Sequence, residues 1–446
     1  MRYLIPLLAL LLIGCDGENS NVAPSKDSPE ETASGTKPPE AVSVNPNLKY
    51  GIKGDAVTIT GCDKKASGEL IIPANIEGKT VTSIGDKAFA FCTNLTSITI
   101  PDGVTNIKDG AFYGCKILTT IEVGAQNVNY AEVNGVLFNK EETLLHTYPA
   151  GKTGANYVIP DSVTSIGDNA FGACKSLTSI TIPDGVTSVD EWAFWECASL
   201  TSITIPDSVT SIGVGAFSTC TSLTTIEVGA ENVNYADVNG VLFNKEKTLL
   251  HTYPAGKTGA NYVIPDRVTS IGDNAFFNCN RLTSIIIPDG VSSIGEYAFN
   301  KCTSLTNITI PDSVTSIGRI AFFKCSKLTS ITIPDGVTSI GASAFTFCDS
   351  LTSITIPDSV TSIGQSAFWS CPSLKSITIP NRVTSIGGSA FYGCNSLTAI
   401  TFFGDAPKIA NDAFKESSPT IYRKADAKDW SGTFAGRPVK LITEKP

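Results

Sequence analysis

Cysteine is the residue whose number and spacing first suggest chemistry in this chain. Its 446 residues include 13 cysteines. Most of these cysteines recur 23 residues apart. This spacing does not match the closely paired ligands of a zinc site, and an odd number of cysteines cannot pair completely. Stacked neighbours would lie within disulfide range, so pairing stays open, but we favour small buried thiols that fill a packed interior. Eleven of the thirteen, here called the ladder cysteines, lie three residues after a phenylalanine: Cys92, Cys115, Cys174, Cys197, Cys220, Cys279, Cys302, Cys325, Cys348, Cys371 and Cys394.

Histidine and aspartate offer little catalytic chemistry. His146 and His251 are the two histidines of the sequence, and no nucleophile and carboxylate recur at matched offsets from them, so we expect surface residues of a hairpin. Aspartates follow proline at regular intervals, and a stacked column of them would favour a calcium ion, although turn formation also explains them. We predict no enzyme activity, no catalytic residue and no cofactor. The calcium candidates are Asp289, Asp312, Asp335 and Asp358.

Aromatic residues vary from unit to unit on either side of a constant Ala-Phe pair. Exposed aromatic rings stack on sugars and anchor protein partners. We expect Phe277, Phe323 and Phe347 to pack against the next unit instead. The candidate ligand-binding residues are therefore Tyr113, Trp192, Trp195, Tyr297, Trp369 and Tyr392.

These candidates lie on a repeat that fills most of the chain. Phenylalanines from Phe89 to Phe414 recur every 23 residues, except for two intervals of 59, each one unit plus an insert of 36 residues. A period in the twenties sustained over a dozen units indicates a solenoid. Residues 118–171 and 223–276 differ at only four positions, which indicates an internal duplication.

One unit, residues 177–199, shows how each coil should fold. Ile180 and Ile182 alternate with hydroxyl residues, the pattern of a strand with one buried face. Pro-Asp-Gly then favours a turn, and a second extended piece leads into a helical or 3₁₀ turn that points Phe194 inward. Because one coil cannot bury these side chains alone, coils must stack with strands about 4.8 Å apart. We predict a β-rich repeat solenoid of about 14 coils with parallel strand ladders.

The unit pattern L-x-x-I-x-I-P-x-x-V-x-x-I-G-x-x-A-F-x-x-C-x-x resembles the treponemal class of leucine-rich repeats in BspA-like bacterial surface proteins. The resemblance covers residues 48 to about 442 and implies a leucine-rich-repeat fold. It also implies hairpin-bearing inserts with Asn-Lys-Glu at the turn, and a cap at each end. The implied divisions are an N-terminal cap at 48–80, a solenoid at 81–404 with inserts near 124–156 and 229–261, and a C-terminal cap at 405–446.

The amino terminus has the features of a lipoprotein signal. Residues 1–14 place one positive charge before an apolar run that is short for a membrane span. Leu12-Ile13-Gly14-Cys15 resembles the bacterial lipobox, so Cys15 is the predicted acylation site. Asp16 leaves sorting open, because an acidic residue there resembles an inner-membrane retention signal in some bacteria and accompanies surface export in others.

Residues 15–47 should form a lipidated, flexible tether, because they lack the apolar side chains needed to build a core. The whole chain has a net charge of −9, which opposes binding to nucleic acid. We expect a monomer in the bacterial cell envelope, anchored to the outer membrane through Cys15 and exposed at the cell surface.

The resemblance implies a lipid-anchored adhesion protein that binds protein components of a host or bacterial surface. An alternative is capture of a glycan or another repetitive polymer, because the outward strand positions are almost uniformly serine and threonine. A surface that templates ice or mineral would use the same lattice, although recent duplication alone explains its uniformity.

Overall fold

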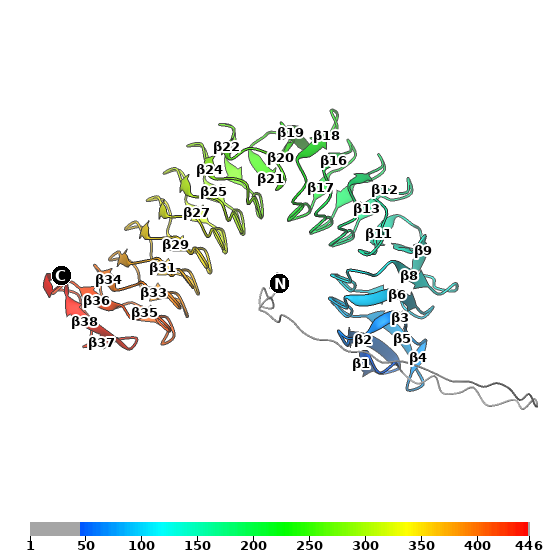
Figure 1. The fold of residues 1–446 in the computed structure, drawn as a ribbon, viewed down its shortest axis with the longest axis horizontal. Coiled ribbons are helices and arrows are strands. Elements are labelled where there is room, and N and C mark those ends of the chain that lie inside the picture. Colours follow the sequence, from blue (N-terminus) through cyan, green and yellow to red (C-terminus); the bar gives the residue numbers. More distant parts are fainter. Residues whose placement is uncertain (1–44, 445–446) are drawn as a thin grey trace, which may run out of the picture. The chain divides into compact units, whose positions relative to one another are not determined.

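A computed structural model describes residues 45–444 (Figure 1). Strands and turns dominate these residues, and the described helix is the short 3₁₀ segment η1 (Ile442–Glu444). Coils follow one another in chain order from blue to red. They form a β-solenoid of about 16 turns, more than the predicted 14, because the caps add turns to the repeating units.

The first strand of each coil belongs to parallel ladders along the stack. In β14 (Ser179–Thr181), Ile180 is 6% exposed while the residues on either side face solvent, as the alternation predicted. Neighbouring first strands pair at an offset of one unit, for example Ser330 with Ser353. The other first strands are β6 (Asn94–Ile100), β8 (Thr120–Val123), β12 (Asn156–Val158), β16 (Ser202–Ile205), β18 (Thr225–Val228), β22 (Asn261–Val263), β24 (Ser284–Ile286), β26 (Asn307–Thr309), β28 (Ser330–Thr332), β30 (Ser353–Thr355), β32 (Ser376–Ile379), β34 (Ala399–Phe402) and β36 (Thr420–Arg423).

The second strand of each coil is only two residues long. The threonine before it bonds twice to the preceding coil: the Thr210 backbone N–H and hydroxyl donate to the Thr187 carbonyl at 2.8 and 3.2 Å. This double contact explains why threonine recurs there. The second strands are β7 (Asn106–Ile107), β13 (Ser165–Ile166), β15 (Ser188–Val189), β17 (Ser211–Ile212), β23 (Ser270–Ile271), β25 (Ser293–Ile294), β27 (Ser316–Ile317), β29 (Ser339–Ile340), β31 (Ser362–Ile363), β33 (Ser385–Ile386) and β35 (Lys408–Ile409).

The segment around each repeat phenylalanine is a hydrogen-bonded turn, so the predicted helical or 3₁₀ turn was wrong. The Phe194 N–H donates to the Ala216 carbonyl of the next coil at 2.8 Å, and the N–H groups of Trp192 and Glu196 also bond to that coil. Between them, the Trp195 N–H bonds within its own coil. Trp192 and Glu196 each have φ of 58°. These left-handed residues, together with donors committed to the next coil, prevent a helix from propagating.

Each insert adds a hairpin and keeps the coil register. In the first insert, Asn134 and Gly135 have φ of 53° and 79°, which suits a tight two-residue hairpin turn. Lys140 and Glu141 form the next turn, as predicted. The third insert strand pairs in parallel with β13, so the stack continues. The insert strands are β9 (Tyr130–Val133), β10 (Val136–Asn139), β11 (Leu144–Thr147), β19 (Tyr235–Val238), β20 (Val241–Asn244) and β21 (Leu249–Thr252).

The hairpins divide the interior into three apolar clusters. Leu137 of β10 packs with the cluster before it, while Val136 and Phe138 of the same strand pack with the cluster after it. Leu242 of β20 joins the middle cluster, and Phe243 joins the third. β10 and β20 are therefore buried on both faces, and each separates two cores.

Both ends of the stack are closed by additional strands. At the amino end, β1 pairs antiparallel with β2, which then pairs in parallel with β5. At the carboxyl end, the Trp430 ring packs 5.0 Å from Phe402 and 4.8 Å from Phe434. The cap strands are β1 (Leu48–Lys53), β2 (Ala56–Cys62), β3 (Ser67–Ile71), β4 (Asn75–Ile76), β5 (Lys79–Ile84), β37 (Thr433–Phe434) and β38 (Arg437–Leu441).

Candidate functional site

Four of the six predicted ligand-binding residues fall in one column of the stack. Tyr113, Trp195, Trp369 and Tyr392 each directly follow a repeat phenylalanine, and all four are half-buried. The residue after each of them forms a second column, and we call these two the turn columns. Their position beside the buried phenylalanine keeps one part of each ring packed and leaves another part in solvent.

Four successive coils bring aromatic rings from the turn columns into contact, and we call this set the aromatic row. Phe323 and Phe347 meet edge to face with centroids 5.5 Å apart, Phe347 lies 5.2 Å from Trp369, and Trp369 lies 5.9 Å from Tyr392. Phe323 is 8% exposed, and the other three are half-buried. The prediction that Phe323 packs against its neighbours is confirmed, but Phe347 also belongs to the half-exposed row.

Lysines lie over rings of the turn columns. The Lys324 ammonium is 5.6 Å from the Phe323 ring centroid and 5.4 Å from that of Phe347. At the far end, the Lys415 ammonium is 5.8 Å from the Tyr392 ring centroid. These distances suit cation–π attraction, so the aromatic row combines flat apolar surface with positive charge. These lysines were not predicted as site residues, although their positions in the same two columns could have identified them.

A second aromatic contact joins coils that are not neighbours. Tyr113 and Trp195 meet with centroids 5.2 Å apart, and Phe91 meets Tyr113 edge to face at 5.1 Å. Burial, with a smaller contribution from the Glu196 carboxylate, raises the pKa of Tyr113 above its ordinary value. Phe91 was not predicted as a site residue, yet it is 54% exposed and extends this cluster.

Trp192 and Tyr297 stand apart from the turn columns, because each precedes its repeat phenylalanine by two residues. The Trp192 ring lies over Gly215, where an added Cβ would come within 2.5 Å of the indole. The same ring meets Phe277 edge to face at 6.5 Å. Tyr297 is half-buried. The six predicted residues therefore do not form one site.

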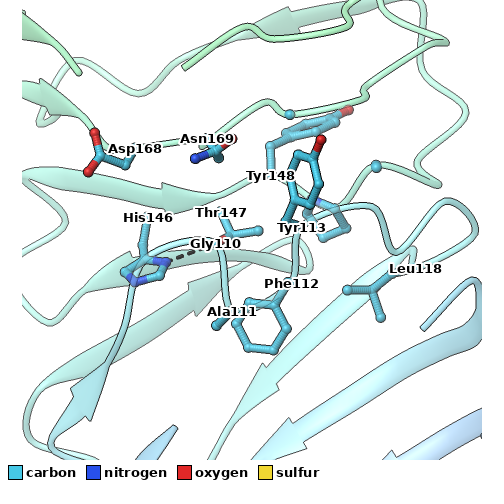
Figure 2. Close-up of a pocket in the computed structure, with 13 residues that line it drawn as sticks. Gly110, Ala111, Phe112, Tyr113, Leu118, His146, Thr147, Tyr148, Asp168 and Asn169 are labelled. Carbon is cyan, nitrogen blue, oxygen red and sulfur yellow. Dashed lines mark hydrogen bonds between the residues drawn. The ribbon is translucent and has the colours of Figure 1, made fainter. Parts of the chain in front are cut away.

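A cavity of about 20 Å³ lies beside the first insert (Figure 2). Tyr113, His146, Tyr148 and Asp168 line it. Its volume is sufficient for about one water molecule and too small for an organic ligand. Burial, followed by the neighbouring Asp109 and Asp190 carboxylates, raises the pKa of Asp168 to about 6. This cavity does not supply a substrate site.

The histidines are more enclosed than predicted. His146 lies in β11 with its ring 5.9 Å from that of Tyr130, and His251 has the equivalent contact with Tyr235. Burial lowers the pKa of both imidazoles. Each Nδ1 lies 2.9 Å from the hydroxyl of the following threonine. The expectation of hairpin surface residues was wrong in part, because both imidazoles are half-buried and their strands β11 and β21 also pair in parallel with the coil stack.

The aspartates of the Pro-Asp corners remain turn residues in the structure. The four calcium candidates, Asp289, Asp312, Asp335 and Asp358, are all exposed. Within residues 45–444, no group of three or more histidine, cysteine, aspartate or glutamate side chains is placed to hold a metal ion. Before the first insert, the Pro-Asp aspartate binds the backbone of the next coil: the Asp102 carboxylate accepts a hydrogen bond from the Gln126 N–H at 2.9 Å.

The cysteines of the described chain are buried free thiols, in agreement with the interpretation that we favoured. Ten of the eleven ladder cysteines also donate a hydrogen bond to the carbonyl of the phenylalanine or tyrosine in the preceding coil. The Cys302 thiol, for example, lies 3.1 Å from the Phe276 carbonyl oxygen. The thiols therefore fill the interior and also connect neighbouring coils.

The predicted acylation site, Cys15, lies outside the described residues. In the part of the chain that the structure does describe, no helix has the length and apolar character to cross a membrane.

Parallel strand ladders, a period of 23 residues and a continuous stack of buried phenylalanines define a leucine-rich-repeat solenoid. The sequence signature of the BspA type leucine rich repeat region (6 copies) matches residues 69–146, 151–250, 257–371 and 292–421. The chain belongs to this family, as its repeat pattern predicted.

Solved bacterial leucine-rich-repeat structures are similar to this chain. A leucine rich cell surface protein of Faecalibacterium prausnitzii A2-165 is 29% identical, covering 80% of this chain and 94% of that one, with a TM-score of 0.49. The pneumococcal vaccine antigen PcpA is 23% identical, covering 86% and 93%, with a TM-score of 0.51. A leucine-rich repeat protein of Eubacterium ventriosum ATCC 27560 is 24% identical, covering 88% and 98%, with a TM-score of 0.46. No curated protein sequence matches the chain.

Proposed function

We propose that this protein is a lipid-anchored cell-surface adhesin that binds protein components of a host or bacterial surface through the aromatic row. Family membership supports a surface binding role, because a relative in the family fold is described as a cell surface protein. The aromatic row carries the proposal. Half-buried Phe347, Trp369 and Tyr392 are held in fixed positions by mutual contact and retain exposed edges.

Rigid aromatic residues are suited to anchoring a partner because they lose little conformational entropy when they are covered. Lys324 and Lys415 add hydrogen-bond donors and positive charge beside the rings. A protein partner with apolar side chains and acidic residues at its rim fits this combination. In the proposed function no catalysis and no cofactor are required.

Trp369→Ala tests the proposal. Bacteria that express the full chain are incubated with labelled extracts of host matrix and of bacterial surfaces, and captured proteins are identified and titrated. Loss of a central aromatic anchor costs about 2 kcal/mol or more, so affinity for a captured protein should fall at least about 30-fold. Thr355→Ala, on an exposed outward strand position of β30, is the matched control and should leave affinity unchanged.

Surface display of each variant is measured with an antibody to the N-terminal cap, so that a poorly folded or poorly exported variant is recognised. Equal affinity of the Trp369→Ala and wild-type proteins for every captured partner would contradict the assignment of the aromatic row. Capture of no protein from either extract would contradict the adhesin proposal itself.

Glycan capture is the second candidate, and the hydroxyl array of the first strands favours it. Ser330 and Thr332 pair in register with Ser353 and Thr355, and all four side chains are exposed. Parallel strands repeat these hydroxyls about every 4.8 Å, a spacing that suits a repetitive polymer. A glycan array separates the two proposals: binding that falls with Thr355→Ala and survives Trp369→Ala would favour glycan capture.

Membrane attachment is tested at Cys15. Metabolic labelling with a fatty-acid analogue should mark the wild-type chain, and Cys15→Ser should abolish both labelling and membrane association. Protease shaving of intact cells then tests outer-surface exposure, which predicts release of solenoid fragments. An unlabelled wild-type chain or a membrane-bound Cys15→Ser chain would refute the proposed anchor.

A further inference from the structure

The first ladder cysteine departs from the rule that the others follow. Ten ladder thiols donate to a phenylalanine or tyrosine carbonyl in the preceding coil. Cys92 belongs to the first coil with a repeat phenylalanine, so the cap rather than another repeat coil precedes it. The acceptor within its reach is the Asp63 carbonyl oxygen, at the long distance of 3.9 Å.

A second thiol occupies the same place. Cys62 is the last residue of β2, and its sulfur lies 3.5 Å from the same Asp63 carbonyl oxygen. The two thiols also influence each other, since neighbouring Cys92, followed by burial, raises the pKa of Cys62. Two thiols that converge on one weak acceptor lie close to each other, and closeness is the first condition for a disulfide.

The electrostatic surroundings favour thiolate formation at this pair. The neighbouring Cys62 thiol, together with the nearby Lys64 ammonium, lowers the pKa of Cys92 to about 7 despite burial. In the middle of the stack burial dominates, and it raises the pKa of Cys302 to about 12. Because the thiolate is the reactive form in thiol–disulfide exchange, Cys92 is chemically distinct from Cys302.

Two other thiol pairs show why proximity alone does not select a disulfide. Burial and then neighbouring Cys220 raise the pKa of Cys197, and neighbouring Cys394 raises that of Cys371. Each of these four sulfurs also donates to a phenylalanine carbonyl at 3.0 to 3.1 Å. Oxidation would remove those bonds inside a packed core, where unsatisfied polar groups are costly. Oxidation of Cys62 and Cys92 would remove no hydrogen bond to a phenylalanine carbonyl, because the acceptor of both thiols is the Asp63 carbonyl.

We propose that Cys62 and Cys92 form a disulfide that fastens the N-terminal cap to the first repeat coil once the protein meets an oxidising compartment. The Cys92 thiolate attacks one sulfur of an oxidant disulfide and releases the other sulfur as a thiolate. The Cys62 thiolate then displaces the oxidant from the mixed disulfide. One S–S bond forms, two protons leave the cysteines, and the oxidant gains two electrons and becomes two thiols. A disulfide oxidoreductase or oxidised glutathione supplies this chemistry.

The position of the bond gives it a structural purpose. An open solenoid end exposes core and unpaired strand edges, so its cap must stay in place. β2 holds the cap through its parallel pairing with β5, and the disulfide would close a loop from the end of β2 to the turn of the first coil. Bridges over loops of this size reduce the population of open states by about 100-fold.

The experiment uses the full chain incubated with oxidised glutathione, so it does not depend on whether the protein is an adhesin. Remaining thiols are alkylated in denaturant without reductant, and peptides are assigned by mass spectrometry. The expected result is a peptide that links Cys62 to Cys92, with the other ladder cysteines alkylated. Cys62→Ser should remove the link and leave Cys92 alkylated, whereas the matched variant Cys197→Ser should keep it.

Hydrogen exchange provides a second measurement. Reducing the wild-type bond should accelerate exchange in β2 and β5 at least 10-fold and leave β31 and β33 unchanged. Alkylation of both Cys62 and Cys92 after oxidation, or a link from Cys92 to Cys115, would overturn the proposal. Exchange in β2 and β5 that is insensitive to reduction of a confirmed link would overturn the capping role.

Discussion

Truncating one ring of the phenylalanine stack tests how the solenoid distributes its stability. The Phe299 side chain is fully buried, and its ring stacks 5.1 Å from Phe276 and 5.2 Å from Phe322. Phe299→Ala leaves a cavity between two coils and removes both stacked contacts. Substitutions of this kind cost about 3 to 5 kcal/mol in a rigid core. At about 1.4 kcal/mol per tenfold, local opening should become roughly 100- to 4000-fold more frequent.

The damage should stay local because each coil contacts only its neighbours. Hydrogen exchange followed by mass spectrometry should show faster exchange in β25 and β27, with β13 and β15 unchanged. Thr332→Ala is the control, since the Thr332 side chain is exposed on β28 and its loss should cost well under 1 kcal/mol. Acceleration spread evenly from β5 to β35, or equal effects of the two variants, would refute the nearest-neighbour account.

Two further predictions concern polar groups between coils. Burial and the neighbouring carboxylates raise the Asp168 pKa to about 6, so the favourable contribution of this group to folding is complete below about pH 4 and is lost as the pH rises through 6. Asp168→Asn should therefore raise the melting temperature at pH 7 but not at pH 4. Asn300 is fully buried, and both atoms of its amide lack a partner within the described residues. Asn300→Thr should raise the free energy of unfolding in urea by about 1 kcal/mol. The reason is that the hydroxyl of Thr346, at the equivalent position, donates to the Ser366 carbonyl at 2.6 Å. A lower urea midpoint for the variant would contradict this.

The stack could be predicted from the sequence because its period fixes the strand register. The alternation around Ile180 identifies the buried face, and a 23-residue offset pairs each strand with its equivalent in the next coil. Parallel pairing of identical residues then follows, since neighbouring coils repeat the same conformation. The resemblance to BspA-like proteins pointed to the same fold, and the family match agrees with it.

The turn could not be predicted because it depends on uncommon backbone conformations. Trp192, Glu196, Lys324 and Phe347 all have positive φ, which side chains of these types rarely adopt and do not signal in a sequence. The neighbouring coil stabilises the conformation by accepting their N–H groups. Local spacing therefore suggested a helix, while hydrogen bonds between coils determined a turn.

The repeat period predicted which candidate residues share a column, but it did not predict all of the contacts between their side chains. Trp369 and Tyr392 lie one coil apart, and their meeting follows from the period. Tyr113 and Trp195 are separated by an insert and two intervening turns, so their contact at 5.2 Å depends on the packing of the insert coil. The Lys324 ammonium over two rings likewise depends on side-chain direction.

Comparison of the two copies within the chain supports placing function on the turn columns. The duplicated blocks 118–171 and 223–276 differ at only four positions, so their buried and strand positions are almost unchanged. Just before those blocks, Tyr113 corresponds to Ser218 in the second copy. An interior substitution must fit two neighbouring coils, whereas half-buried turn-column residues such as Tyr113, Trp369 and Tyr392 have one side in solvent and can change with less disturbance to the stack. The turn columns therefore offer the positions at which a repeated scaffold can acquire a specific binding surface, and the aromatic row occupies four of them in succession.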